Sequence, residues 1–258
     1  MAKKFYVVWQ GHKPGIYTDW NSCKKQVDKF AGARYKSFPT EAEALAAYGG
    51  SPSTSGKTSA TAAPKKRAPS KAPSVKTYTA SEVKALPAEV KIFTDGGCDP
   101  NPGKAGSGLA LYRSNAVSEL WYGLFNPMGT NNTAELNALH QALLMAEKEL
   151  NDGLSVAIFC DSKYSIQCVT QWAVGWQKKG WKKAGGEIKN LELIKEMFAL
   201  HQSLKDKIQV LHVNGHVGVE GNELADRMSI LAIDKQDVSF NKYAEVIDIP
   251  LILSMRQG

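Results

Sequence analysis

The sequence predicts an α/β protein in three parts: a small N-terminal α/β domain, a disordered linker, and a larger domain with a mixed five-stranded sheet flanked by helices. Two observations support this prediction. After residue 87, β-branched and apolar runs alternate with helical patterns, as in a sheet covered by helices. Residues 49–86 are rich in Ser, Thr, Ala, Pro and Lys and almost lack large apolar side chains, so they cannot build a core. We place the domains at residues 1–48 and 87–235, with a C-terminal extension at 236–258.

In the N-terminal domain, residues 5–9 form an apolar run that predicts a strand, and a glycine-punctuated turn leads to a second strand near residues 16–18. Helical patterns follow at residues 21–30 and 40–48. Such a short domain has little core but is feasible.

The larger domain begins with a strand at residues 90–95, ended by Gly96-Gly97. Residues 109–113 and 119–123 predict antiparallel neighbours for it, and residues 208–213 another strand. Residues 155–161 are almost continuously apolar, which indicates a central strand covered on both faces. Helical spacing runs from residue 134 to 150, and a helix capped by Asn222 runs to about residue 234.

Four carboxylates stand at the edges of these elements. Asp95 and Asp161 close two apolar strands, while Glu135 and Asp226 lie in the opening turns of two helices. Singly, each acid suits a turn or a helix dipole. Together they would repel one another unless a divalent cation joined them, and oxygen ligands favour Mg²⁺ or Mn²⁺. Two such ions roughly 4 Å apart would catalyse phosphodiester hydrolysis.

The residues around these acids form four motifs. They are Thr94-Asp95-Gly96-Gly97-Cys98 with Asn101-Pro102-Gly103, then Thr130-Asn131-Asn132-Thr133-Ala134-Glu135-Leu136, then Asp161-Ser162, and finally Asn214-Gly215-His216 with Asn222-Glu223 and Ala225-Asp226. In order and spacing, residues 88–235 resemble the type 1 ribonuclease H family.

The resemblance implies an endonuclease that hydrolyses the RNA strand of RNA/DNA hybrids and leaves 3′-hydroxyl and 5′-phosphate ends. Asp95, Glu135, Asp161 and Asp226 would bind two Mg²⁺ ions, with Mn²⁺ as an alternative. His216 would assist product departure or proton transfer. The sequence agrees with this role, because His216 follows a predicted strand in a glycine-flanked loop from which an imidazole can reach the acids.

Substrate contacts are expected at Asn101, Thr130, Asn131 and Asn132, within the same motifs. Short amide side chains suit the 2′-hydroxyls and base edges of a shallow minor groove, and only RNA has the 2′-hydroxyl. For Asn101, between two prolines, simple turn chemistry is the alternative.

A second stretch interleaves Trp172, Trp176 and Trp181 with Lys178, Lys179, Lys182 and Lys183. Aromatic side chains with clustered lysines suit a nucleic-acid backbone. The stretch resembles the basic protrusion of cellular ribonucleases H, which grips the DNA strand. Trp172 and Trp176, four residues apart, could equally pack in the core.

Residues 5–48 resemble the hybrid-binding domain that precedes many ribonuclease H catalytic domains and that also occurs in viroplasmin proteins. Gly15-Ile16-Tyr17, Thr18-Asp19-Trp20, Gln26-Val27 and Ala33-Arg34-Tyr35-Lys36 carry the resemblance. It implies that Trp20 and Tyr35 pack on the DNA strand and that Lys36 adds charge. Without the resemblance, both aromatics would be read as core residues.

Charge is distributed unevenly. Residues 1–48 carry 8 Lys and Arg against 4 acids, residues 49–86 carry 7 against 1, and residues 87–258 carry 17 against 20. A net acidic catalytic region needs local patches or a basic module to attract nucleic acid. The basic linker would tether that module and raise the local concentration of hybrid, although Lys65-Lys66-Arg67 could also be a nuclear signal.

The cysteines show no metal-ligand spacing, which suggests reduced thiols. No long apolar run or signal-peptide pattern is present, so we expect a cytoplasmic protein without membrane contact. No obligatory protein partner is evident, and a monomer is expected. Two other classes compete with the nuclease. A non-catalytic hybrid-binding protein would lack an acid, and a transposase or junction resolvase would lack the asparagines, the lysine stretch and the N-terminal module.

Overall fold

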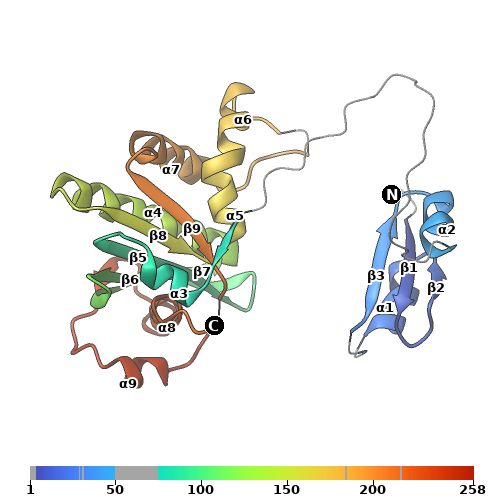
Figure 1. Ribbon diagram of the computed structural model, residues 1–258, viewed down its shortest axis with the longest axis horizontal. Coiled ribbons are helices and arrows are strands. Elements are labelled where there is room, and N and C mark those ends of the chain that lie inside the picture. Colours follow the sequence, from blue (N-terminus) through green and yellow to red (C-terminus); the bar gives the residue numbers. More distant parts are fainter. Residues whose placement is uncertain (1–3, 29, 31, 50–74, 184, 216) are drawn as a thin grey trace. The chain divides into compact units, whose positions relative to one another are not determined.

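The computed structural model describes residues 4–28, 30, 32–49, 75–183, 185–215 and 217–258 (Figure 1). The chain divides into two compact units, residues 1–69 and 70–258. The predicted linker falls largely on residues 50–74, outside the described residues, as does His216.

The N-terminal unit is a three-stranded antiparallel sheet in the order β2-β1-β3, with two helices. Its elements are β1 (Phe5–Gln10), β2 (Gly15–Tyr17), α1 (Trp20–Val27), β3 (Arg34–Phe38) and α2 (Glu41–Gly49). Both helices and two of the strands follow the sequence pattern. The third strand, β3, was not predicted, because its exposed residues show no apolar run.

The second unit contains a seven-stranded mixed sheet in the order β10-β7-β6-β5-β8-β9-β4. Its strands are β4 (Thr77–Tyr78), β5 (Val90–Asp99), β6 (Gly103–Arg113), β7 (Ala116–Gly129), β8 (Val156–Cys160), β9 (Ile208–Val213) and β10 (Phe240–Lys242). β5, β6, β7 and β10 pair antiparallel, and β5, β8, β9 and β4 pair parallel. The mixed sheet is confirmed, with two short edge strands added to the predicted five.

Helices cover both faces of this sheet (Figure 1). They are α3 (Ala80–Ala85), α4 (Asn131–Asn151), α5 (Lys163–Gln167), the π-helical turn η1 (Cys168–Trp172), α6 (Ala173–Lys178), α7 (Leu191–Leu204), α8 (Glu220–Lys235) and α9 (Ile249–Leu253). Alternate residues of β5 divide between two cores: Ile92 packs with α4 and α7, and Phe93 packs with α8. The period of two along the strand thus creates a three-layer domain.

The end of the predicted linker is not a tether. Residues 77–86 form β4 and α3, and β4 pairs with β9. Val83 is buried in the core, and the buried Lys91 ammonium donates to the carbonyl oxygens of Val83 (2.6 Å) and Lys84 (3.0 Å). Two residues therefore hold residues 77–86 on the domain. Val83 packs in the core, and Lys91 donates to carbonyl oxygens at the end of α3, where a helix leaves carbonyl groups without a partner of its own.

The extension at 236–258 packs on its own unit. β10 pairs with β7, and Ile252 of α9 is buried in the core below α8. Among the described residues, no helix has the length and apolar character needed to cross a membrane.

Candidate active site

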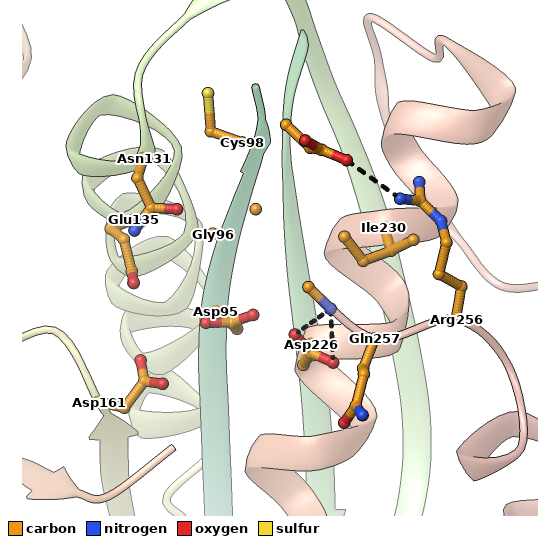
Figure 2. A pocket seen from close by; sticks show the side chains of 13 residues that line it. Asp95, Gly96, Cys98, Asn131, Glu135, Asp161, Asp226, Ile230, Arg256 and Gln257 are labelled. Atoms are coloured by element: carbon orange, nitrogen blue, oxygen red, sulfur yellow. Dashed lines mark hydrogen bonds and ion pairs between the residues drawn. The ribbon is translucent and has the colours of Figure 1, made fainter. Parts of the chain in front are cut away.

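The four predicted acids line one pocket of about 450 Å³ (Figure 2). Asp95 comes from β5, Glu135 from α4, Asp161 from the end of β8 and Asp226 from α8. Four elements that are distant in sequence therefore deliver their carboxylates to one place.

Asp95 lies within β5 rather than at its end, because the strand continues through Gly96 and Gly97 to Asp99. The prediction that Gly96-Gly97 ends the strand is wrong, and Gly96 instead allows close packing. A Cβ on Gly96 would collide with the Glu135 nitrogen of α4, and one on Gly108 would collide with the Ala225 carbonyl of α8. Both helices can therefore approach the sheet where Asp95 stands. The parallel partner β8 pairs with β5 only as far as Thr94, so Asp95 is at the open edge of that half of the sheet.

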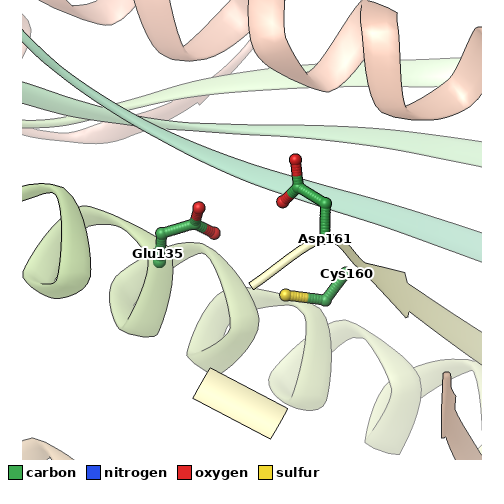
Figure 3. A group of neighbouring side chains, drawn as sticks. All are labelled: Glu135, Cys160 and Asp161. Carbon is green, nitrogen blue, oxygen red and sulfur yellow. The ribbon is translucent and has the colours of Figure 1, made fainter. Parts of the chain in front are cut away.

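Glu135 and Asp161 face each other across this edge, with Cys160 beside them (Figure 3). Ligand atoms of the three side chains lie within 4.8 Å of one another. Among the described residues, no hydrogen-bond partner reaches Oε2 of Glu135. Burial raises the pKa of the Cys160 thiol well above its usual value, so it stays protonated and is a poor ligand for a hard cation.

Asp226 is held differently from the other acids. It lies in the second turn of α8, which begins at Glu220 and not at the predicted cap Asn222. Nη1 of Arg227 donates to Oδ2 of Asp226. The backbone N–H of Gly258 lies 3.1 Å from Oδ1 and 3.4 Å from Oδ2 of the same carboxylate. The extension thus reaches the active-site pocket, which no local pattern in the sequence predicts.

Arg256 completes this side of the pocket (Figure 2). Its guanidinium lies 2.8 Å from Asp234 of α8 and 3.5 Å from Asp99 of β5. It is the one positively charged side chain among the described residues that line the pocket.

The electrostatics of the pocket favour bound cations. Burial, followed by the Asp161 and Asp226 carboxylates, raises the pKa of Asp95 well above its usual value. Burial, followed by Asp95 and Asp161, does the same to the pKa of Glu135. Ser229 offers Asp95 one long hydrogen bond of 3.4 Å. The pocket therefore gathers carboxylates whose charged forms are disfavoured by burial and by one another, and a nearby positive charge would stabilise those forms.

The predicted substrate residues divide between pocket and rim. Asn131 lines the pocket, and its backbone N–H donates to Oδ1 of the exposed Asn101 at 3.3 Å. Thr130 caps α4 by accepting from the Thr133 N–H at 3.2 Å, and Asn132 is exposed in its first turn. Asn101 therefore bonds the backbone of Asn131, and Thr130 caps the helix on whose first turn Asn131 lies.

In the stretch of tryptophans and lysines, the two residue types differ in burial. Trp172, Trp176 and Trp181 are half-buried against the core, with ring contacts from Trp172 to Tyr164 and Trp176, and from Trp181 to Phe198. By contrast, the lysines at positions 178, 179, 182 and 183 are exposed. The aromatic residues thus support a surface on which the lysines are free to contact a polyanion.

In the N-terminal unit, Trp20 and Tyr35 are 42% and 46% exposed, and their ring centroids lie 5.8 Å apart. Lys36 is also exposed, with its ammonium 5.6 Å from the Phe38 ring centroid. Because core residues would be buried, Trp20 and Tyr35 are not core aromatics. Their rings form an exposed aromatic surface.

One residue beside the acids was missed. His212 of β9 is buried, and its Nε2 lies 3.1 Å from the carbonyl oxygen of Asp161. Burial, with a smaller contribution from Lys163, lowers the pKa of His212. In the sequence it appears only as one polar residue in an apolar strand.

This fold and its clustered acids define a nuclease domain of the ribonuclease H-like class. Residues 87–233 match the RNase H family, and residues 4–48 match the ribonuclease H1 N-terminal domain. The human protein named ribonuclease H1 is 33% identical over 262 residues, which cover 87% of each chain, and its mouse counterpart is 31% identical over 254 residues with the same coverage. The fold also matches a foamy viral protease-reverse transcriptase, with a TM-score of 0.50 and 22% identity over 66% of this chain and 24% of that one.

The chain belongs to the ribonuclease H family, as a ribonuclease H enzyme that carries the N-terminal domain of ribonuclease H1.

Proposed function

We propose that this enzyme cleaves the RNA strand of RNA/DNA hybrids internally, using two divalent ions held by Asp95, Glu135, Asp161 and Asp226. The observation that carries the proposal is the meeting of these four carboxylates in one pocket, two of them with strongly raised pKa values.

The residues present fit such ions. Glu135 has a buried oxygen that no described residue bonds, and the set of four carboxylates is the hard-oxygen donor set that Mg²⁺ and Mn²⁺ prefer. When bound, two such ions activate an attacking water and stabilise the leaving oxygen. The Cys160 thiol, although close, does not belong to this donor set.

The other side chains bind the strand and move protons. Asn131 lines the pocket and its backbone N–H donates to Asn101, and we propose that its side-chain amide contacts a ribose 2′-hydroxyl beside the acids. Water adds its oxygen to phosphorus, the bond from phosphorus to O3′ breaks, and O3′ takes a proton. The products are a 3′-hydroxyl and a 5′-phosphate. His216, which lies outside the described residues, follows in sequence Gly215, which packs against Oδ2 of Asp161, and we propose that it assists proton transfer or product departure.

The remaining surfaces bind the duplex. The exposed lysines 178, 179, 182 and 183 suit the DNA phosphates, and Trp20, Tyr35 and Lys36 form a second nucleic-acid surface on the N-terminal unit. We propose that this unit binds the hybrid and that the linker keeps it near the catalytic domain.

A direct assay tests the proposal. End-labelled RNA/DNA hybrid, RNA duplex, DNA duplex and single strands are incubated with Mg²⁺, Mn²⁺ or EDTA, and the product ends are mapped. We expect internal cuts in the RNA of the hybrid alone, only with a divalent ion, and 5′-phosphate ends that a phosphatase removes. Cleavage of duplex DNA at comparable rates would instead favour the transposase or resolvase class.

A further inference from the structure

Two side chains and one backbone carbonyl, from three regions of the chain, form a line that ends at the active site. Oγ1 of Thr77, in β4 near the start of the second unit, lies 2.8 Å from Nδ1 of His212. Nε2 of His212 lies 3.1 Å from the carbonyl oxygen of Asp161. The register places these residues together, because β9 lies between β4 and β8, and His212 is opposite both Thr77 and Cys160.

We propose that His212 is a positioning residue for Asp161, and that Thr77 fixes the orientation of its ring. The inference rests on the proposed function of Asp161 as a metal ligand. It gives the edge strand β4 a role in catalysis.

The chemistry of the partners assigns the donors. A carbonyl oxygen can only accept, so Nε2 of His212 must carry the proton that it donates to Asp161. In a neutral ring Nδ1 is then an acceptor, and the hydroxyl of Thr77 donates to it. The Thr77 hydroxyl therefore favours the tautomer that His212 needs in order to hold Asp161.

Asp161 needs this support because its backbone lies beyond the sheet. The pairing of β8 with β9 ends at Cys160 and His212, one residue before Asp161. On the side-chain end, Nδ2 of Asn222 lies 3.3 Å from Oδ2 of Asp161, and Gly215 lies close against the same oxygen. The imidazole fixes the backbone, and these neighbours fix the carboxylate. Together they determine where the carboxylate points.

Full-length variants separate positioning from folding. His212→Ala, His212→Gln, Thr77→Val and Thr77→Ser are compared by calorimetric titration with Mn²⁺ alone, by single-turnover cleavage, and by hybrid affinity without divalent ions. We expect His212→Ala to lose about 10- to 100-fold in Mn²⁺ affinity and cleavage rate, with unchanged hybrid affinity. Thr77→Val should lose less, while Thr77→Ser and, in part, His212→Gln should restore function, since each keeps the required donor.

Thr170→Val is the matched control, because its hydroxyl donates to the Ile166 carbonyl within its own helical segment (2.7 Å) and makes no other hydrogen bond within the part of the chain that the structure describes. Thermal melts at the assay pH ensure that every variant is measured fully folded. Wild-type Mn²⁺ affinity and rate in both His212→Ala and Thr77→Val, or losses in Thr170→Val as large as those in Thr77→Val, would overturn the positioning role. Asp161→Asn tests the underlying assignment independently, since unchanged Mn²⁺ affinity in that variant would remove Asp161 from the metal site altogether.

Discussion

Gly96 of β5 lies directly against Glu135 of α4, so close that a Cβ atom on the glycine would collide with the glutamate's backbone nitrogen. The contact sets the distance between the strand that carries Asp95 and the helix that carries Glu135. Gly96, which the sequence alone suggests is a strand terminator, thus acts as a spacer: its lack of a Cβ atom sets how closely the two acid-bearing elements approach.

Gly96→Ala should force α4 away from β5. Overpacking of this kind costs about 1–3 kcal/mol of the free energy of unfolding, and it should separate two acids and reduce cleavage. Thermal unfolding and single-turnover rates measure the two effects. Gly175→Ala in α6 is the control, because a Cβ atom there would point into open space. This substitution should be neutral or slightly stabilising. If both variants behave alike, Gly96 is not a spacer.

Asp95→Asn and Asp161→Asn each remove one charge while keeping the shape of the side chain. Metal-assisted catalysis contributes several kcal/mol, so cleavage should fall by roughly 100-fold or more while hybrid affinity is retained. Asp206→Asn, at an exposed position, should cleave normally. Near-normal turnover in either active-site variant contradicts the proposed metal site.

Stability without metal should depend on pH in a specific direction. Because the pKa values of Asp95 and Glu135 are raised in the folded state, protonation favours the folded protein, and the contribution is full below the unfolded-state pKa values. It is lost as the pH rises through the raised values, at about 1.4 kcal/mol per unit of pKa difference.

Melting temperatures measured in EDTA should therefore contain a component that falls toward neutral pH, and Mg²⁺ should restore it. Glu135→Gln should flatten this component and abolish the Mg²⁺ response. A Mg²⁺-induced shift of wild-type size in that variant would show that Glu135 does not bind the ion.

Two truncations should differ sharply. Deleting residues 1–75 removes the N-terminal unit but keeps β4 and α3, so the product should fold and cleave hybrids while binding them more weakly. The slope of log affinity against log salt should flatten by about 0.9 per lost phosphate contact.

Deleting residues 1–86 also removes Thr77, Val83 and the carbonyl oxygens that Lys91 bonds. Leaving a buried ammonium without these acceptors should cost about 1–3 kcal/mol or more. Equal melting temperatures for the two products would show that residues 76–86 add nothing to the catalytic domain.

We expect the extension to compete with cations for Asp226. Since the Gly258 N–H donates to the carboxylate that would hold an ion, deleting residues 254–258 should lower the half-saturating Mg²⁺ concentration by about 2- to 10-fold, the worth of one typical hydrogen bond. Arg256→Ala should act in the same direction, and Arg113→Ala, which breaks ion pairs with Glu119 and Glu149, should not. Weaker Mg²⁺ binding after the deletion would mean that the segment supports the site.

Much of the fold follows from local pattern. Strands β1, β5 and β8 appear as apolar runs and α4 as a helical stripe, because burial on one or two faces leaves a period in the sequence. Strand β3 and the pair β4 and α3 leave no such trace, since exposed residues in one case and a single buried valine in the other carry little periodicity.

Residue type and local order alone indicate the four acids that line one pocket, the two domains and the basic charge before residue 87. Only the tertiary structure decided that Gly96 is a spacer, that Thr77 reaches Asp161 through His212, and that Gly258 lies on Asp226. The physical reason is the same in all three cases. These are contacts between residues distant in sequence, where one hydrogen bond or one missing Cβ has its effect only after the sheet has brought the partners together.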